Sequence, residues 1–166
     1  MLMSAYGEDI YRFCRQFTGD AQLAEDLRQV VFIQAYEQLP QAVPRSTLRA
    51  WLYGVARHRC LDACKGRSRW RKRFHLTEAL PEPVTSDNAP DPDSALDQPV
   101  LARALEHCLE KFDHEQRMLI LMRCRDGLSY SELSETFRTA PATLQARVTR
   151  ALPMLRRCVQ GQGVLP

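Results

Sequence analysis

The sequence predicts an all-α protein with two small helical domains joined by a flexible acidic linker, the second domain containing a helix-turn-helix. Apolar residues recur at three- and four-residue steps through most of the first 75 residues and again after residue 98, as they do along amphipathic helices. Between these blocks, residues 76–98 contain four prolines and six carboxylates but no lysine or arginine, a composition typical of an extended, disordered segment. We therefore expect a domain over residues 1–75, the linker over 76–98, a second domain with a separate core over 99–160, and a tail over 161–166.

The net charge of +3 is distributed unevenly along the chain. The first 75 residues carry 13 lysines and arginines against 7 carboxylates, the linker has a net charge of −6, and residues 99–166 carry 10 basic residues against 7 acidic ones. Two basic blocks therefore flank an acidic connector. A strong positive field favours a polyanionic partner such as nucleic acid.

The stretch from Arg45 to Arg73 is the most basic part of the chain, with ten lysines and arginines against one carboxylate, Asp62. As a helix, it would carry positive charge along one side and an apolar seam along the other. That seam consists of Leu48, Trp51, Leu52, Val55 and Ala56. Trp51 and Trp70 lie among the charges, where aromatic rings suit unstacked bases. A solvated basic helix with core aromatic residues is the alternative interpretation.

Two helices are expected ahead of this basic stretch. One covers residues 5–17 and stops at Gly19, and the other covers residues 21–39, is capped by Asp20 and ends at Pro40. The second helix has a regular apolar stripe consisting of Leu23, Leu27, Val30, Val31, Ala35 and Leu39. The polar side of this helix begins with acidic residues, which ordinarily do no more than interact favourably with the helix dipole. A solvated face that binds no partner is therefore the alternative interpretation of this side.

The second domain is also expected to be helical, with helices over residues 100–112 and 114–125 and a stop at Gly127. The first of these helices is predicted to bury Leu101, Leu105, Leu109 and Phe112. The second is predicted to bury Met118, Leu119, Leu121 and Met122.

A helix-turn-helix is predicted at the end of this domain. Ser129 or Ser131 caps a short helix, residues 138–140 turn, and a longer helix starts near Pro141, with Pro153 expected to bend it. The buried side of the longer helix is predicted to hold Leu144, Val148, Ala151, Leu152 and Leu155. Its outer face then carries Gln145, Arg147, Thr149 and Arg150. Such side chains can contact bases or phosphates in a major groove, although any helical corner has a similar pattern.

The six cysteines are predicted to be reduced. Cys14, Cys108, Cys124 and Cys158 fall in apolar helical patterns and are expected to be small core residues. His58, Cys60 and Cys64 share a helix, but their spacing matches no strong zinc signature. We expect no metal, and a Cys/His redox or metal sensor remains an alternative.

The chain lacks a run of eighteen apolar residues, and its N-terminus shows no signal-peptide pattern. We therefore expect a cytoplasmic protein without direct membrane insertion. The sequence also lacks a glycine-rich phosphate loop, a nucleophile motif and paired carboxylates of recognised metal-binding spacing. We expect neither an enzyme nor a cofactor.

Three motifs occur together and in order: AEDLRQVVFIQAYEQL, LRAWLYGVARHRCLDACKGRSR, and GLSYSELSETFRTAPATLQARVTRAL with a closing LRR. This arrangement resembles the two conserved domains of extracytoplasmic-function sigma factors, the small bacterial subunits that direct RNA polymerase to promoters. The resemblance extends from about Tyr6 to Cys158 and includes the variable acidic linker. Three ordered motifs are far more specific than any one of them.

The resemblance implies a role for three groups of residues. Core RNA polymerase would be bound by Glu25, Asp26, Arg28 and Gln29. The minus-ten promoter element would be opened and captured by Arg49, Trp51, Arg57, His58, Arg59, Asp62 and Lys65. The minus-thirty-five element would be recognised as duplex by Thr143, Gln145, Ala146, Arg147, Thr149 and Arg150. The partners would be core RNA polymerase, promoter DNA and an anti-sigma factor.

Three positions depart from the family pattern. His58 stands where the family usually has Asn, and Arg138 and Ala142 stand where it usually has Gly. The first departure affects base preference at the melted element. The other two affect the turn and the tilt of the second helix.

Promoter geometry agrees with two joined domains. Elements about seventeen base pairs apart are separated by roughly 60 Å, which exceeds the reach of one compact domain. A fully extended linker of 23 residues spans about 80 Å at most. A helix-turn-helix regulator that acts without polymerase is the other alternative, but it gives no role to the basic stretch from Arg45 to Arg73.

Overall fold

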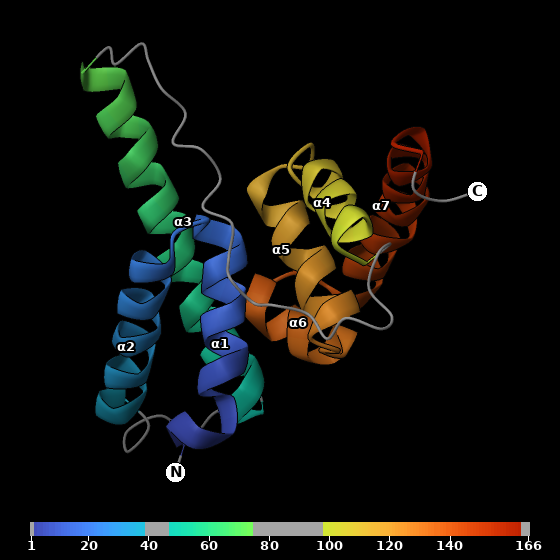
Figure 1. Cartoon of the computed structure of the whole chain (residues 1–166). Coiled ribbons are helices and arrows are strands. Elements are labelled where there is room, and N and C mark those ends of the chain that lie inside the picture. The colour runs from blue at the N-terminus through green and yellow to red at the C-terminus, as the bar shows by residue number, and fades with distance from the viewer. Residues whose placement is uncertain (1, 39–46, 75–97, 164–166) are drawn as a thin grey trace.

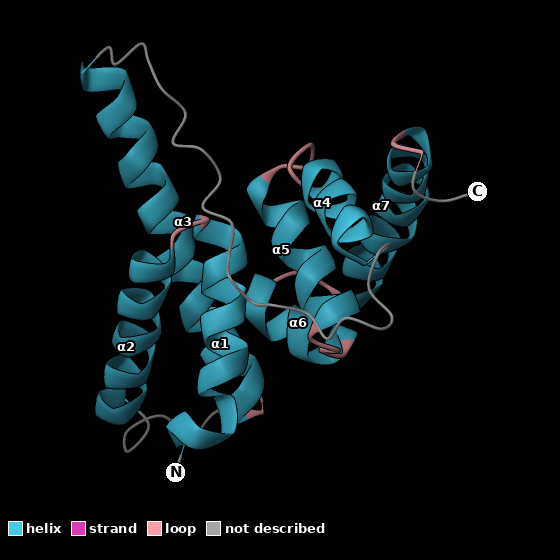
Figure 2. Ribbon diagram, viewed as in Figure 1, coloured by secondary structure: helices cyan, strands magenta, loops and turns pink. Residues whose placement is uncertain are grey.

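The computed structural model describes residues 2–38, 47–74 and 98–163, and these ranges are helical and contain no strand (Figure 2). The N-terminal unit consists of α1 (Leu2–Thr18), α2 (Ala21–Gln38) and α3 (Leu48–Phe74). The C-terminal unit consists of α4 (Gln98–Leu109), α5 (His114–Ile120), the π-helical segment η1 (Leu121–Arg125), α6 (Tyr130–Phe137) and α7 (Pro141–Gly161). The all-α prediction is confirmed. Apart from Gln98, which begins α4, the predicted linker lies outside the described residues.

Local signals in the sequence set the boundaries of the first two helices. α1 ends at Thr18, and Gly19 follows with a φ of 70°, a conformation that glycine adopts without steric cost. Asp20 then caps α2, because its Oδ1 accepts a hydrogen bond from the backbone N–H of Leu23 at 3.0 Å. The predicted stop and cap are both confirmed.

The three N-terminal helices enclose a tightly packed core. Phe13 of α1 meets Tyr53 of α3 edge to face, with ring centroids 5.6 Å apart, and both side chains are fully buried. Val31 of α2 is also fully buried, but Val30 is 39% exposed. The predicted stripe was therefore too wide: adjacent residues point about 100° apart on a helix, so only one of the two valines faces the core.

The hydrophobic core continues from the N-terminal unit into the C-terminal unit, where Figure 1 shows α5 and α6 beside α1 and α3. The C-terminal members of this cluster are Met118, Leu119, Met122, Leu128, Leu133, Phe137, Leu144 and Val148. The predicted separate cores are thus wrong. The periodic pattern correctly identified Met118, Leu119 and Met122 as buried, but it could not show that the N-terminal unit covers them.

A second, smaller cluster joins α4 to α5, η1 and α7. It consists of Ala104, Cys108, Leu109, Ile120, Leu121, Ala151, Leu155 and Val159. Leu101 and Leu105 of α4 are exposed, as is Leu152 of α7, contrary to the prediction. The small residues Ala104 and Cys108 face α7 instead, which places the two α4 leucines farther around the helix.

The helix-turn-helix forms as predicted. Ser129 caps α6 through a capping box with Glu132. Arg138 ends α6 in the left-handed conformation, with a φ of 50°. Pro141 is the first residue of α7, and this helix continues through Pro153 to Gly161.

The cysteines fall into three environments. Cys14 is buried as predicted, with its Sγ 3.6 Å from the Sγ of Cys60. Cys108 and Cys158 form a disulfide that joins α4 to α7, and Cys124 is exposed. Cys108 is buried as predicted, but its bond to Cys158 contradicts the prediction of reduced cysteines, because helical periodicity does not reveal which cysteines face one another across two helices. Cys124 is a free thiol as predicted, but it is not a core residue.

Candidate nucleic-acid and polymerase interfaces

The predicted polymerase-binding residues lie on the outer surface of α2. Asp26 and Gln29 are exposed, whereas Glu25 and Arg28 are half-buried and form an ion pair at 2.5 Å. The hydrogen bond from Arg28 lowers the pKa of the Glu25 carboxyl group. This part of the surface is therefore polar and carries both positive and negative charges. The ion pair between Glu25 and Arg28 fixes the positions of those two side chains.

Apolar side chains extend this surface toward the end of α2. Ile33 is 57% exposed and Tyr36 is 83% exposed, and Val30 lies on the same side at helical spacing. Together with Asp26 and Gln29, they form what we call the α2 face. Sequence analysis did not select Ile33 and Tyr36, although both fall outside the predicted buried stripe, which is the signal that could have identified them.

The predicted minus-ten residues on α3 divide into two groups. His58, Arg59, Asp62 and Lys65 are exposed, and Arg59 also donates two hydrogen bonds to Oε1 of Gln34 on α2, at 2.8 and 3.2 Å. The other group, Arg49, Trp51 and Arg57, is only half-exposed. The structure thus places all seven on one helix, but it leaves only four of them openly accessible.

Arg49 and Arg57 are covered by the C-terminal unit. Arg49 donates a hydrogen bond to the backbone carbonyl of Asp126. Arg57 forms an ion pair with Glu115, and its guanidinium lies 4.6 Å from the centroid of the Phe137 ring. Only 14% of the Arg57 side chain is exposed. Both guanidinium groups therefore have partners within the chain.

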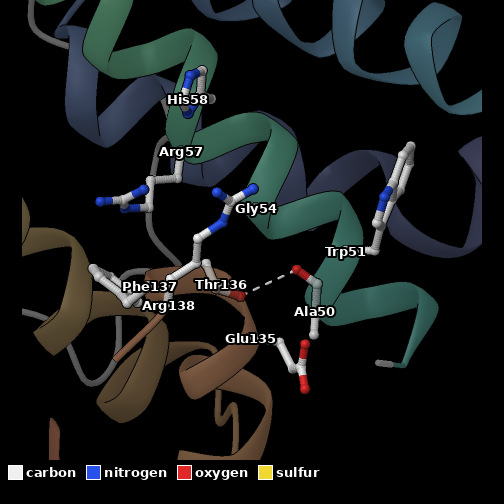
Figure 3. A pocket seen from close by; sticks show the side chains of 9 residues that line it. All are labelled: Ala50, Trp51, Gly54, Arg57, His58, Glu135, Thr136, Phe137 and Arg138. Atoms are coloured by element: carbon white, nitrogen blue, oxygen red, sulfur yellow. Dashed lines mark hydrogen bonds between the residues drawn. The ribbon is translucent and has the colours of Figure 1, made fainter. Parts of the chain in front are cut away.

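A hollow of about 520 Å³ lies beside this contact, between α3 and the end of α6 (Figure 3). Its α3 wall consists of Ala50, Trp51, Gly54, Arg57 and His58. Glu135, Thr136, Phe137 and Arg138 form the opposite wall. Thr136 Oγ1 donates a hydrogen bond to the carbonyl of Ala50 at 3.2 Å, and Figure 3 shows the Arg138 side chain extending from the turn toward α3.

The predicted minus-thirty-five residues lie along the first half of α7. Thr143, Gln145, Ala146, Thr149 and Arg150 are exposed. Arg147 is half-buried, and its Nε donates a hydrogen bond to Oε1 of Gln116 on α5 at 3.0 Å. This last contact suits a structural role for Arg147 better than a role in reading bases.

The proposed metal or redox trio does not assemble into a site. Cys60 is fully buried against Cys14, whereas His58 is exposed on the same helix. The contact with Cys14, together with burial, raises the pKa of the Cys60 thiol. Within the described ranges, no group of three potential metal-binding side chains is found, and no described helix is long and apolar enough to span a bilayer.

Comparison with known proteins gives matches over both units. Residues 2–70 match Sigma-70 region 2, and residues 102–155 match Sigma-70, region 4. The ECF RNA polymerase sigma factor SigE of Mycolicibacterium smegmatis is 28% identical over 157 residues, covering 93% of this chain and 59% of that protein. SigX of Bacillus subtilis is 26% identical over 157 residues, covering 95% of this chain and 81% of that protein. The chain thus spans less than two thirds of the length of SigE.

A similar fold occurs in the sigma factor RpoE of Bartonella quintana, solved in complex with the anti-sigma factor NepR. The TM-score is 0.76 at 20% sequence identity, and the superposition covers 95% of this chain and 94% of that one. At this level of identity, the likeness concerns the fold.

Proposed function

Because this chain belongs to the extracytoplasmic-function sigma factors, we propose that it binds core RNA polymerase in the cytoplasm and directs it to start transcription at a specific set of promoters. The observation that carries this proposal is the order of its two units. A region 2 match containing the basic helix α3 precedes a region 4 match containing the helix-turn-helix. Two DNA-binding units of different type suit two separate promoter elements.

The α2 face is the proposed docking surface for core RNA polymerase. It combines the exposed polar groups of Asp26 and Gln29 with the exposed apolar side chains of Ile33 and Tyr36. Exposed apolar side chains beside polar groups are a usual composition of a protein–protein interface. An exposed tyrosine such as Tyr36 is well suited to anchor such an interface.

The exposed residues of α3 and α7 are the proposed DNA-binding surfaces. His58, Arg59 and Lys65 can contact the phosphates and bases of an opened strand, and Gln145 and Arg150 can reach a major groove. The Bartonella quintana relative was solved with an anti-sigma factor, which supports a protein of that kind as the third partner here.

Reconstitution with core RNA polymerase on a promoter library tests this function. We expect the wild-type holoenzyme to start transcription at a defined subset of promoters. Asp26→Ala should weaken association with core polymerase and leave binding to upstream duplex DNA intact. Arg150→Ala should do the reverse, weakening duplex binding by about tenfold, the loss expected for one good base or phosphate contact.

Two matched variants control for the loss of charge. Glu8→Ala removes an exposed carboxylate from α1, and Arg103→Ala removes an exposed guanidinium from α4. Both should behave as wild type in the two assays. If Asp26→Ala and Arg150→Ala lose both activities together, the assignment of separate roles is wrong, and a wild-type protein that fails to join core polymerase contradicts the proposed function itself.

A further inference from the structure

The first half of α7, which carries the proposed minus-thirty-five residues, is tied to α5 by the side chain of Gln116. Its Oε1 accepts a hydrogen bond from Nε of Arg147 at 3.0 Å, and its Nε2 donates to the backbone carbonyl of the same residue at 3.3 Å. Both side chains are half-buried. One carboxamide group thus holds the side chain and the backbone of a single α7 residue at once.

Gln116 itself belongs to a fixed part of α5. Its backbone N–H donates to Oδ1 of Asp113 at 2.8 Å, and this bond caps the helix. Met118 and Leu119 follow closely in the same helix, and both are fully buried in the core that joins the two units. The helix α5 therefore provides a rigid base from which Gln116 can hold α7.

Apolar packing alone would leave the rotation of α7 loosely defined. Leu144 and Val148 are buried, but apolar contact is non-directional, whereas a hydrogen bond weakens steeply when its angle changes. Pro153, which cannot donate a backbone hydrogen bond, separates this half of α7 from the half that ends at Gly161. The two bonds from Gln116 are therefore suited to fix the rotation of the first half.

A small rotation of α7 would displace the side chains that are proposed to contact DNA. An α-helix with its side chains has a radius of about 5–6 Å, so a rotation of about 10° moves the end of a side chain by about 1 Å. Hydrogen-bond lengths vary by only about 0.5 Å. Gln145, Thr149 and Arg150 are exposed on the same half of α7, so their alignment with the bases depends on the bonds at Arg147.

We propose that Gln116 is a positioning residue for recognition of the minus-thirty-five element, and that Arg147 acts through Gln116 by setting the orientation of α7. This inference rests on the proposed function, because it gives α5 a part in the recognition of upstream duplex DNA. A contact to a phosphate by a long, flexible side chain survives a small shift of the helix, whereas a contact to a base edge, which carries the sequence information, requires strict geometry. Loss of the Gln116 contact should therefore reduce discrimination between bases more than it reduces overall promoter use.

Gln116→Met is the main test. Methionine is a flexible, unbranched side chain of similar length to glutamine but lacks the amide, so both bonds to Arg147 are lost while the packing is kept. Wild-type and variant holoenzymes are compared on a promoter library in which only the bases of the minus-thirty-five element vary. We expect a single mismatched base to reduce transcription about tenfold with the wild type and only about threefold with the variant. Transcription from the best promoter should fall by no more than about threefold, since the phosphate contacts remain.

Two further variants separate positioning from a loss of charge. Gln116→Glu keeps an acceptor for Nε of Arg147 but loses the donor to the backbone carbonyl, so it should restore most of the discrimination. Arg147→Lys keeps the positive charge but lacks the Nε–H group, so it should discriminate as poorly as Gln116→Met. In the double variant, Gln116→Met with Arg147→Lys, the loss should be no greater than in either single variant, because both changes remove the same contact.

Gln162→Met is the matched control, because it makes the same chemical change at an exposed position just beyond α7. It should discriminate between bases as the wild type does. Circular dichroism of each free chain shows whether the variants are folded at the assay temperature. Should Gln116→Met be unfolded there, the comparison of Arg147→Lys and Gln116→Glu with the wild type decides the question.

Wild-type discrimination by Gln116→Met would overturn the inference. A uniform loss of transcription that leaves the ranking of bases unchanged would also overturn it, because such a loss indicates a merely structural role, and so would additive losses in the double variant. All of these outcomes require an active wild type. A wild-type holoenzyme that starts transcription at no promoter of the library would instead contradict the proposed function, and the inference with it.

Discussion

Glu132 stabilises two structures with one carboxylate. It accepts hydrogen bonds from the backbone N–H and hydroxyl of Ser129, at 2.8 and 2.9 Å, which completes the capping box of α6. It also accepts the hydroxyl of Thr47 from the N-terminal unit at 2.6 Å. The bond from Thr47 is the main cause of a lowered pKa for Glu132, followed by the bonds from Ser129. The same residue thus links a helix cap to the docking of two units.

The lowered pKa predicts a specific pH dependence of stability. Since folding favours the ionised form of Glu132, this contribution is fully present above the ordinary value of 4.5 and is lost as the pH falls through the lower folded value. Glu132→Gln should lower the free energy of unfolding by about 1 kcal/mol at neutral pH. Denaturant titrations across a pH series should show this difference shrinking below pH 4.5.

Glu135→Gln is the control for this prediction, since it makes the same chemical change at an exposed position on the same helix. It should alter stability by no more than about 0.5 kcal/mol. Parallel pH profiles for wild type and Glu132→Gln would show that the Glu132 carboxylate does not contribute in this way.

Residue roles that depend on near neighbours could be predicted from the sequence, and those that depend on distant ones could not. The caps by Asp20 and Ser129 follow from residues within three positions of each other; the first was predicted, and the second was one of two predicted candidates, Ser129 and Ser131. The partner of Arg57 lies 58 positions away, and no local pattern specifies it. The DNA-binding role predicted for Arg57 follows from the family resemblance alone, which specifies no partner within the chain.

At the scale of the element, α4 depends on one covalent bond. It contributes only Ala104, Cys108 and Leu109 to the buried cluster, a small apolar area for a helix of 12 residues. Cys108 also bonds to Cys158 of α7, 50 positions away in the sequence. Propensity and periodicity predicted that a helix forms here, although its end and its buried face differ from the prediction, and neither can reveal a bond between two distant cysteines.

Removal of this disulfide should destabilise the C-terminal unit. In the chain-entropy model, a closed loop of this length stabilises the folded state by about 4 kcal/mol. We expect a double change, Cys108→Ser with Cys158→Ser, to lower the free energy of unfolding by about 2–4 kcal/mol. Hydrogen exchange should show faster exchange in α4 than in α5 or α6.

The exposed Cys124 provides the comparison for this experiment. Cys124→Ser removes a thiol of the same unit without touching the bond between α4 and α7, so stability should stay within about 0.5 kcal/mol of wild type. If the double change has no greater effect than Cys124→Ser, or if a thiol reagent titrates all six cysteines after denaturation without a reductant, the disulfide does not stabilise α4 in solution.

At the scale of the whole molecule, the two units behave as parts of one packed body. One cluster contains Phe13 of α1, Tyr53 of α3, Met118 of α5 and Leu133 of α6, all fully buried. The sequence predicted two helical units in the correct order, because composition changes sharply at the acidic segment. It did not predict that they share a core, because periodicity specifies which side of a helix is apolar and not which helix covers it.

Because the two units share a core, a substitution that destabilises one unit should also lower the stability of the other. Both tryptophans, Trp51 and Trp70, lie in the N-terminal unit, so fluorescence reports the unfolding of that unit alone. Leu133→Ala in α6 should destabilise the protein by about 2–5 kcal/mol and lower the unfolding midpoint seen by tryptophan fluorescence as well as the one seen by circular dichroism. Leu155→Ala, which belongs to the second cluster between α4 and α7, should shift the fluorescence midpoint less. If Leu133→Ala leaves the fluorescence midpoint unchanged while the circular dichroism midpoint falls, the units unfold independently, and the contact between α3 and α6 is too weak to couple them.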